Sequence, residues 1–252
     1  MEKFMDNKSW DGLAADYDKS VEDNQNPLII NYLEKEIEIL DALCQKHGDS
    51  YKNFSIIDMG AGTGRVVFAL DKKLRNDSIK FFGVENSDSM LNYANQKNIS
   101  HDGLSEITFL KYDLTDSKLS QYFELKNSNI VMCSYNTLGV VPSDKRLSFI
   151  NNMKTIAGKN GLVILTMFNG DDFGFVAPKM YHSMLPMIKQ IDDDSFDETN
   201  RVFHNSIGFR SQWFTKNEIK SMLDTSLEPI PIDVVIDDKC HTFGNVFVNV
   251  IA

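Results

Sequence analysis

Apolar residues along the chain follow two alternating patterns, short continuous runs and repeats at three- and four-residue steps. The short runs are rich in Ile, Val and Phe and predict buried strands at residues 55–59, 80–85, 107–113, 129–134 and 161–168. The repeats predict amphipathic helices at residues 28–47, 65–74, 87–96 and 145–157. Strands that alternate with helices pair in parallel and are covered on both faces. The pattern therefore predicts a doubly wound α/β sheet.

The last third of the chain changes in character. Residues 169–200 contain Gly, Pro, three Met and an acidic run at 192–198. We interpret the acidic run as a solvated loop. Residues 201–214 alternate roughly between apolar and polar and are predicted to be extended. We expect residues 169–212 to form a lid or substrate insert that follows the fifth strand and covers the strand ends.

The C-terminal residues complete the predicted sheet. Thr215 and Glu218 have the spacing of a capping box and predict a helix at 215–223. Apolar runs at 232–237 and 245–251, joined by a short polar connection, predict an antiparallel pair. The expected fold is a seven-stranded, mostly parallel sheet with helices on both faces and an antiparallel last strand. We expect one domain over residues 1–252, whose residues 1–47 form an N-terminal helical cap.

Composition restricts the classes of function. The chain has 252 residues, of which 42% are hydrophobic and 25% charged, and its formal net charge is −10. This charge, without any Lys/Arg cluster, argues against nucleic acid as a partner. No apolar run approaches the length of a membrane span, and the N-terminus does not resemble a signal peptide. The three separated cysteines predict neither a disulfide framework nor a metal site, so we expect a cytoplasmic protein.

The clearest chemical signal is D-M-G-A-G-T-G-R at residues 58–65, where a glycine-rich turn follows a strand and opens a helix. Glycines at 60, 62 and 64 allow a ligand to approach the main chain closely. Dinucleotide enzymes use G-x-G-x-x-G, and here the third glycine comes one residue early. Asp58 would also repel a pyrophosphate, whereas a carboxylate at this position suits a cationic ligand.

Two further acids end the next strands. Glu85 ends the second strand, where a carboxylate accepts hydrogen bonds from both hydroxyls of a ribose. Asp113 ends the third strand and can accept from the exocyclic amine of a base. Because the carboxyl ends of parallel strands line one crevice, the ligand should combine a ribose, a base and a positive charge. S-adenosylmethionine has all three.

These motifs resemble those of the class I S-adenosylmethionine-dependent methyltransferases, which have a Rossmann-like sheet. The resemblance rests on D-M-G-A-G-T-G-R, G-V-E-N-S-D-S-M-L (83–91) and K-Y-D-L (111–114). The opening W-D-G-L-A-A-D-Y-D (10–18) and S-Q-W-F-T-K-N-E-I-K-S-M-L (211–223) are also similar to small-molecule members. The resemblance covers roughly residues 10–168 and 211–251. The resemblance implies S-adenosylmethionine as the cofactor.

The resemblance also assigns residues to the cofactor. The loop under the methionine portion would be Gly60, Ala61 and Gly62, with Asp58 facing the amino group. Glu85 would hold the ribose, with Asn86 beside the adenine. The remaining expected cofactor contacts are Asp113 and Leu114 at the adenine edge, Ser134 after the fourth strand, and Tyr17 closing over the methionine end.

The acceptor is harder to predict, because methyl transfer requires alignment more than acid–base chemistry. The turn after the fourth strand, S-Y-N-T-L-G (134–139), lacks the prolines of enzymes that methylate amino groups of bases or glutamine. Its form is similar to enzymes acting on small molecules, including amines and amino acids. We expect transfer to nitrogen or oxygen of a small molecule that is neutral or cationic. Tyr135, Asn136 and His182 are the expected catalytic residues, with His182 as a possible base.

Two other functions stay open from the sequence. Attack on another carbon of the sulfonium would give an aminopropyl-type transferase or a cyclase that releases methylthioadenosine. A non-catalytic module that binds S-adenosylmethionine would carry the same glycine motif. We expect a monomer or homodimer without a membrane or nucleic-acid partner.

Overall fold

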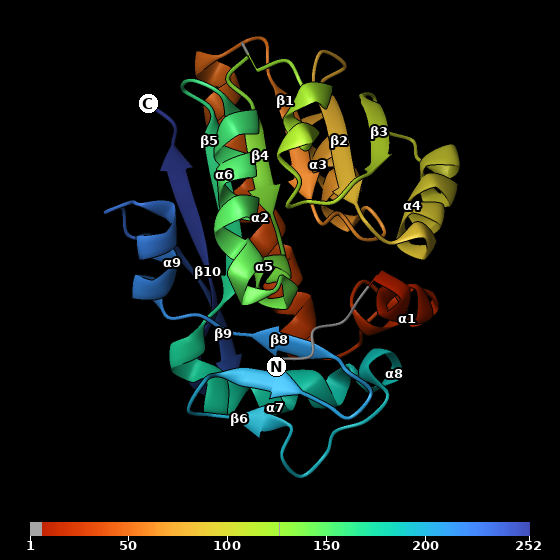
Figure 1. Ribbon diagram of the computed structural model, residues 1–252, viewed down its shortest axis with the longest axis vertical. Coiled ribbons are helices and arrows are strands. Elements are labelled where there is room, and N and C mark those ends of the chain that lie inside the picture. The colour runs from red at the N-terminus through yellow and green to blue at the C-terminus, as the bar shows by residue number, and fades with distance from the viewer. Residues whose placement is uncertain (1–6, 126) are drawn as a thin grey trace.

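The protein is built around one mixed sheet, seen in a computed structural model that describes residues 7–125 and 127–252. Residues 1–6 of the predicted N-terminal cap lie outside the described part. The seven strands have the order β3-β2-β1-β4-β5-β10-β9 (Figure 1). They are β1 (Ser55–Met59), β2 (Lys80–Glu85), β3 (Glu106–Lys111), β4 (Ile130–Cys133), β5 (Leu162–Phe168), β9 (Ile230–Ile236) and β10 (Lys239–Val250).

The strand directions confirm the predicted fold. Strands β1 to β5 pair in parallel, and β10 pairs antiparallel with both β5 and β9. A short turn between β9 and β10 permits only antiparallel pairing, whereas helical crossovers separate the parallel strands. The sequence is therefore right about the seven strands and the antiparallel end of the sheet.

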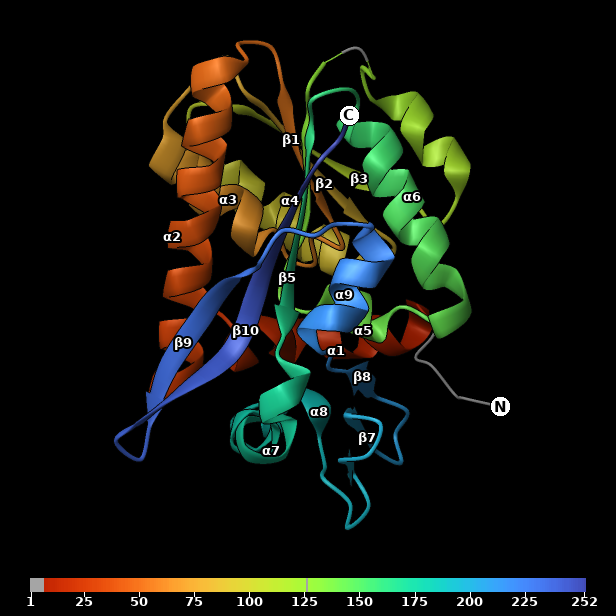
Figure 2. The same ribbon diagram turned by 90° about the vertical axis from the view of Figure 1, so that its left-hand side faces the viewer.

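Two hydrophobic layers cover the sheet. Every residue of β5 is buried, and its alternate side chains enter opposite layers, Ile164 on one side and Leu165 on the other. Helices α2 (Pro27–Ser50) and α3 (Arg65–Leu74) pack on the first side, and α6 (Arg146–Ala157) and α9 (Lys216–Leu223) on the second (Figure 2). This two-sided burial explains why the strands are continuous apolar runs in the sequence.

Helix boundaries follow local capping. The Ser87 side chain accepts a hydrogen bond from Met90 N at the start of α4 (Asp88–Ser100), which extends four residues beyond the predicted end at 96. Thr215 and Glu218 form the predicted capping box of α9. Of the helices that the structure describes, none combines the length and apolar character required to cross a membrane.

Short elements shape the carboxyl end of the sheet. Helix α1 (Asn7–Ser20) lies there beside α4 and α8 (Leu185–Ile188) (Figure 1). The turn after β4 leads into α5 (Thr137–Val140), which packs near the end of β5. The remaining short helices of the sheet region are η1 (Ser117–Tyr122) and η2 (Ser143–Lys145).

Residues 169–212, here called the insert, form a further layer below the strand ends (Figure 2). Their elements are η3 (Gly170–Asp172), α7 (Phe173–Ser183), α8 (Leu185–Ile188), β6 (Phe196–Asp197), β7 (Val202–His204) and β8 (Arg210–Gln212). The three strands form a small antiparallel sheet, which agrees with the extended prediction for 201–214. The sequence prediction missed α7, because Pro178 lies inside the helix and proline is disfavoured in the interior of a helix.

We expect the buried part of β10 to stabilise the core. Phe247 of β10 is 2% exposed, whereas Val250 of the same strand is 54% exposed. Phe247→Ala should lower the free energy of unfolding by about 3–5 kcal/mol, because it leaves a cavity in the core. Val250→Ala should change it by less than about 0.5 kcal/mol. Urea denaturation measures both variants, and equal effects would contradict the placement of this strand.

Candidate active site

A cavity of about 280 Å³ opens at the carboxyl ends of β1, β2 and β3. Its walls come from α1, the glycine loop, the ends of β2 and β3, and the segment from α5 to η2. The lining residues are Trp10, Tyr17, Gly60, Gly62, Glu85, Asn86, Ser87, Met90, Asp113, Leu114, Thr115, Thr137, Val140, Val141, Pro142 and Lys145. The structure thus brings most of the predicted cofactor residues to one place.

The glycine loop is bare because its positive φ angles favour glycine and because Thr137 approaches Gly60 closely. Gly60 has φ +86°, and a Cβ on it would lie 2.4 Å from Thr137 Cγ2. Gly62 has φ +55°, and a Cβ on it would lie 3.8 Å from the Tyr17 ring. Gly60 N and Ala61 N donate to Val84 O over 2.8 and 3.1 Å, which pins the loop to β2. Side chains at 60 and 62 would therefore strain the backbone and narrow the cavity.

Glu85 organises the opposite wall. Its carboxylate accepts hydrogen bonds from Gly62 N (2.9 Å), Asn86 N (2.8 Å) and Ser87 N (2.9 Å). Burial raises the pKa of Glu85, and these three N–H groups oppose the shift by stabilising the ionised form. A carboxylate fixed in this way presents acceptor oxygens to the cavity, as binding of ribose hydroxyls requires.

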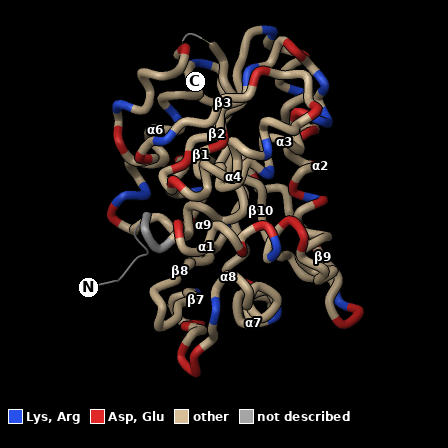
Figure 3. The backbone as a smooth tube through the Cα atoms, turned by 90° about the vertical axis from the view of Figure 1, so that its right-hand side faces the viewer, with Lys and Arg blue, Asp and Glu red and all other residues tan. Residues whose placement is uncertain are grey.

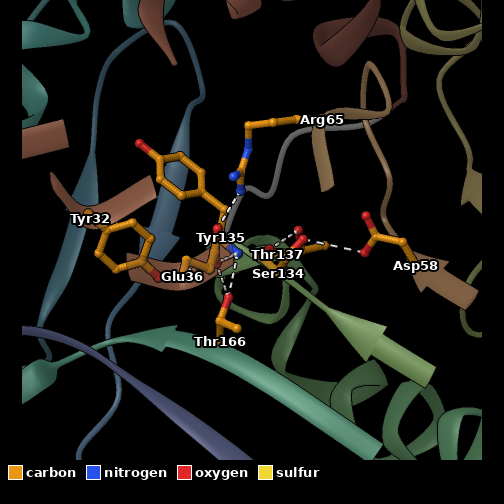
Figure 4. A network of polar contacts seen from close by, with 8 residues as sticks. All are labelled: Tyr32, Glu36, Asp58, Arg65, Ser134, Tyr135, Thr137 and Thr166. Atoms are coloured by element: carbon orange, nitrogen blue, oxygen red, sulfur yellow. Dashed lines mark hydrogen bonds and ion pairs between the residues drawn. The ribbon is translucent and has the colours of Figure 1, made fainter. Parts of the chain in front are cut away.

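Asp58 lies beneath the loop and is 1% exposed. Burial raises the pKa of Asp58 to about 7, although the Arg65 guanidinium opposes the shift. Ser134 Oγ donates to its Oδ1 over 3.4 Å (Figure 4). Asp58, Ser134 and Ala61 do not line the cavity themselves. Ala61 belongs to the glycine loop, and Asp58 lies just behind this loop, so its charge acts on a ligand in the cavity.

The third strand supplies the outer edge of the cavity. Asp113 and Leu114 follow β3 and line the cavity, as does Asn86 after β2. Asp113 Oδ1 accepts from Thr115 N (2.9 Å) and Thr115 Oγ1 (2.7 Å), which fixes the turn. Its side chain is exposed, so hydrogen-bonding capacity remains for a ligand.

Helix α1 is tied across the cavity by polar contacts. Asp11 Oδ1 accepts from Ser87 Oγ over 2.6 Å, at the N-terminus of α4. Near the other end of α1, Asp18 accepts from Thr63 Oγ1 over 2.6 Å and pairs with Lys97 over 2.9 Å. These contacts hold Tyr17 against the glycine loop.

The three predicted catalytic residues do not line the cavity. Tyr135 is packed among the rings of Tyr32 and Phe168. Asn136 is 2% exposed, and its Nδ2 donates to Ser211 Oγ (3.1 Å) and to Gln212 O (2.9 Å).

His182 lies apart from the other predicted site residues. Its side chain is exposed on α7, and its Nδ1 lies 2.6 Å from Pro178 O. The structure therefore does not bring this imidazole together with the cavity.

A buried carboxylate that the sequence prediction missed connects α3 to the turn after β4. Glu36 of α2 is fully buried, and its Oε2 lies 2.5 Å from Arg65 Nη2 (Figure 4). Its Oε1 accepts from Tyr135 N over 3.0 Å and from Thr166 Oγ1. A sequence signal existed, because Glu36 falls on the same helical face as the buried Tyr32 and Leu40.

The left-handed turn after β4 depends on this network. Tyr135 and Asn136 have φ +49° and +61°, which is uncommon for consecutive residues other than glycine. Glu36 and Thr166 hold the N–H of Tyr135, and Thr166 O accepts from Asn136 N over 2.9 Å. The strain is therefore compensated by buried hydrogen bonds on both residues.

The cavity fits S-adenosylmethionine in its chemistry. Bare backbone lies next to the buried acid Asp58, which suits a positively charged amino-acid portion. Glu85 suits a ribose, and the exposed Asp113 beside Leu114 suits the edge and face of a base. When bound, this cofactor supplies an electrophilic methyl group on a sulfonium.

The comparisons with known proteins agree with the fold and with the class of cofactor. Residues 50–226 match the family model of the methyltransferase domain. The chain therefore belongs to this family, and it is a class I S-adenosylmethionine-dependent methyltransferase. S-adenosylmethionine is its cofactor.

Two solved structures show how far the likeness in fold extends. A methyltransferase structure from Clostridium acetobutylicum ATCC 824, described as S-adenosylmethionine-dependent, has 14% identity and a TM-score of 0.57, covering 95% of this chain and 97% of its own. The DszA carbon methyltransferase structure has 15% identity and a TM-score of 0.60, covering 86% and 54%. Both show the shared fold.

A sequence relative is the carboxy-S-adenosyl-L-methionine synthase of Campylobacter hominis. It is 30% identical over 110 residues, which are 44% of this chain and 42% of the relative. The match thus spans less than half of that protein, and its activity is not transferred by the likeness alone.

Glu85 provides a direct test of the cofactor site. Glu85→Gln should weaken S-adenosylmethionine binding about ten- to hundredfold, because a neutral amide accepts hydrogen bonds less strongly than a carboxylate. Calorimetry measures the change, with the surface variant Glu106→Gln as control, since its carboxylate pairs with Lys80 on the edge of the sheet. Unchanged affinity in Glu85→Gln would remove this residue from the site.

Asp58 should make stability and cofactor affinity depend on pH in opposite directions. Its raised pKa of about 7 means that the folded protein keeps a proton that the unfolded chain loses near pH 4. The stability contribution of Asp58 therefore falls as pH rises from about 4 to about 7. A cationic ligand favours the ionised form, so affinity should rise over the upper part of this range and binding should release a proton.

Binding calorimetry at about pH 6 and about pH 8, in buffers of different ionisation enthalpy, measures the cofactor affinity and the proton release. Asp58→Asn should remove this proton release. Proton release that is unchanged in Asp58→Asn would assign the titration to another group.

Proposed function

We propose that this enzyme methylates a nitrogen or oxygen atom of a small, neutral or cationic metabolite. The observation that carries the proposal is the enclosure of the cavity by α1 and the segment from α5 to η2. Tyr17 lies against the glycine loop, and Thr137 lies on the other side of the loop at Gly60. Such walls admit a small acceptor beside the cofactor and exclude a folded polymer.

Charge supports the same class of acceptor. The net charge is −10, and acidic residues occur at the far end of the insert (Figure 3). Near the cavity, Lys97 pairs with both Asp18 and Glu22. The surroundings of the cavity therefore disfavour a polyanionic acceptor.

The proposed chemistry is alignment rather than acid–base catalysis. Among the described residues that line the cavity there is no histidine, and its titratable side chains are Tyr17, Glu85, Asp113 and Lys145. Burial raises the pKa of Tyr17, which makes this phenol a poor base. The favoured nucleophile is therefore an amine with a free lone pair or an oxygen that is already ionised, since neither requires a protein base.

We assign the roles of the residues accordingly. Glu85 holds the ribose and Asp113 the base edge, and the charge of Asp58 attracts the positive amino group from behind the glycine loop. Asn136 acts as a positioning residue, because its amide ties the turn after β4 to β8 of the insert. His182 receives no role in this proposal, because its ring is exposed and held within α7.

A second candidate is modification of the cofactor itself. The observation in its favour is the 110-residue likeness to a carboxy-S-adenosyl-L-methionine synthase. In that case the product would retain the adenosyl portion and gain mass on the former methyl group. Release of methylthioadenosine would instead indicate the aminopropyl-type or cyclising reaction.

Product analysis distinguishes these reactions. The enzyme is incubated with methyl-labelled S-adenosylmethionine and a panel of small amines, amino acids and hydroxy acids. We expect a labelled acceptor and an equal amount of S-adenosylhomocysteine, with Glu85→Gln, whose ribose contacts are weakened, as the control with reduced turnover. A heavier cofactor or methylthioadenosine would contradict the proposed transfer to nitrogen or oxygen.

A further inference from the structure

Strand β3 is one of the two outer strands of the seven-stranded sheet, and its free edge lies on the side of α4 (Figure 1). Tyr112 N, just after β3, donates to Glu85 O of β2 over 3.0 Å. Successive N–H groups of a strand point to opposite sides. The N–H and C=O groups of Ile107, Phe109 and Lys111 therefore point to the free edge, and no strand of the described residues pairs with them.

The opposite edge of the sheet, β9, is protected in a way that β3 is not. Lys35 Nζ donates to Asp233 O of β9. Pro231 lies two residues before Asp233, so its nitrogen faces the same way and offers no N–H to another strand. The six residues of β3 include no proline. Because natural sheets protect edges that must not pair, β3 is the edge suited to a partner strand.

The surface beside the β3 edge is neutral. Asn98 Nδ2 of α4 donates to Ile107 O over 3.4 Å, which places this side of the helix next to the edge. Asn95 and Ile99 flank Asn98 on the exposed surface of α4. Ile99 is 87% exposed, and Leu104, two residues before β3, is 50% exposed. Since the chain has a net charge of −10, a neutral face is where two copies approach with least repulsion.

The two ends of β3 carry opposite charges. Glu106 begins the strand and Lys111 ends it. A second β3 strand running antiparallel brings the Lys111 end of one copy beside the Glu106 end of the other, whereas a parallel one brings like charges together. Charge complementarity therefore favours an antiparallel copy of the same strand.

We propose that β3 pairs antiparallel with β3 of a second copy of this chain, about a two-fold axis at Phe109. Phe109 then lies opposite Phe109 of the second copy, and Ile107 lies opposite Lys111. All three outward-facing residues become members of hydrogen-bonded pairs, as an antiparallel ladder requires. The two sheets join into one, and the assembly closes as a dimer because the two-fold contact uses the free β3 edge of both copies.

The oligomeric state is the first test. The chain has a mass of 28.7 kDa, and sedimentation velocity should give twice this mass at about 50 µM protein. Ile99→Glu should raise the dimer dissociation constant at least about tenfold, because the two added carboxylates face each other across the contact. Val235→Glu is the matched control, since it adds a carboxylate to β9 at a residue that is 67% exposed. Its dissociation constant should equal that of the wild type.

A pair of variants at one position tests the strand pairing itself. Lys111→Pro removes the outward N–H and places the proline ring at the free edge, so it should weaken the dimer at least about a hundredfold. Lys111→Ala removes the same side chain but keeps the N–H, and it should stay within about tenfold of the wild type. Thermal unfolding and calorimetry with S-adenosylhomocysteine check that all variants fold.

Amide hydrogen exchange locates the contact. The N–H groups of Ile107 and Phe109 should exchange at least about tenfold more slowly in the wild-type dimer than in Ile99→Glu. A wild-type mass of 28.7 kDa at about 100 µM, or assemblies larger than a dimer, would overturn the proposal. So would a dimer that Ile99→Glu and Lys111→Pro leave intact, or one whose β3 amides are not protected.

Discussion

The buried ion pair between Glu36 and Arg65 is the interaction on which the site depends. Arg65 is the first residue of α3, the helix behind the glycine loop. Glu36 lies on α2, which packs against α3. Their 2.5 Å contact is shielded from water, so the attraction is strong and loss of one partner would leave a charge buried. Because Glu36 also holds the N–H of Tyr135, the pair links the cofactor loop to the turn after β4.

This linkage explains how one sheet can carry both halves of a transfer reaction. The cofactor half is built from strand ends, where the carboxylate of Glu85 and the backbone of Gly60 and Gly62 meet the cavity. The other half is built from α1 and the turn after β4, which Asn136 connects to β8 of the insert. The two halves are connected by packed, hydrogen-bonded groups, namely the Glu36–Arg65 pair and the bond from Tyr135 N to Glu36. The family membership supplies the reaction class, and in the proposed function these connections position the acceptor.

Sequence reasoning found what is local and missed what depends on packing. The strands, α3 with boundaries at 65 and 74, and the capping box at Thr215 follow from short-range patterns, and the structure confirms them. Glycines and acids at strand ends were also identifiable, because topology brings strand ends together. The partners of Asn136 and the exposure of His182 were not, since both depend on how the insert folds. Glu36 was missed because its role comes from residues that are 29 to 130 positions away.

A double-mutant cycle on Glu36→Gln and Arg65→Met tests the central claim that this pair organises the site. Each single variant should lower the free energy of unfolding by about 3–5 kcal/mol, because a buried charge or donor loses its partner. The double variant should be destabilised by clearly less than the sum, with a coupling of at least about 1 kcal/mol. Equilibrium unfolding in urea measures all four proteins. Additive effects, with no coupling between positions 36 and 65, would contradict the account.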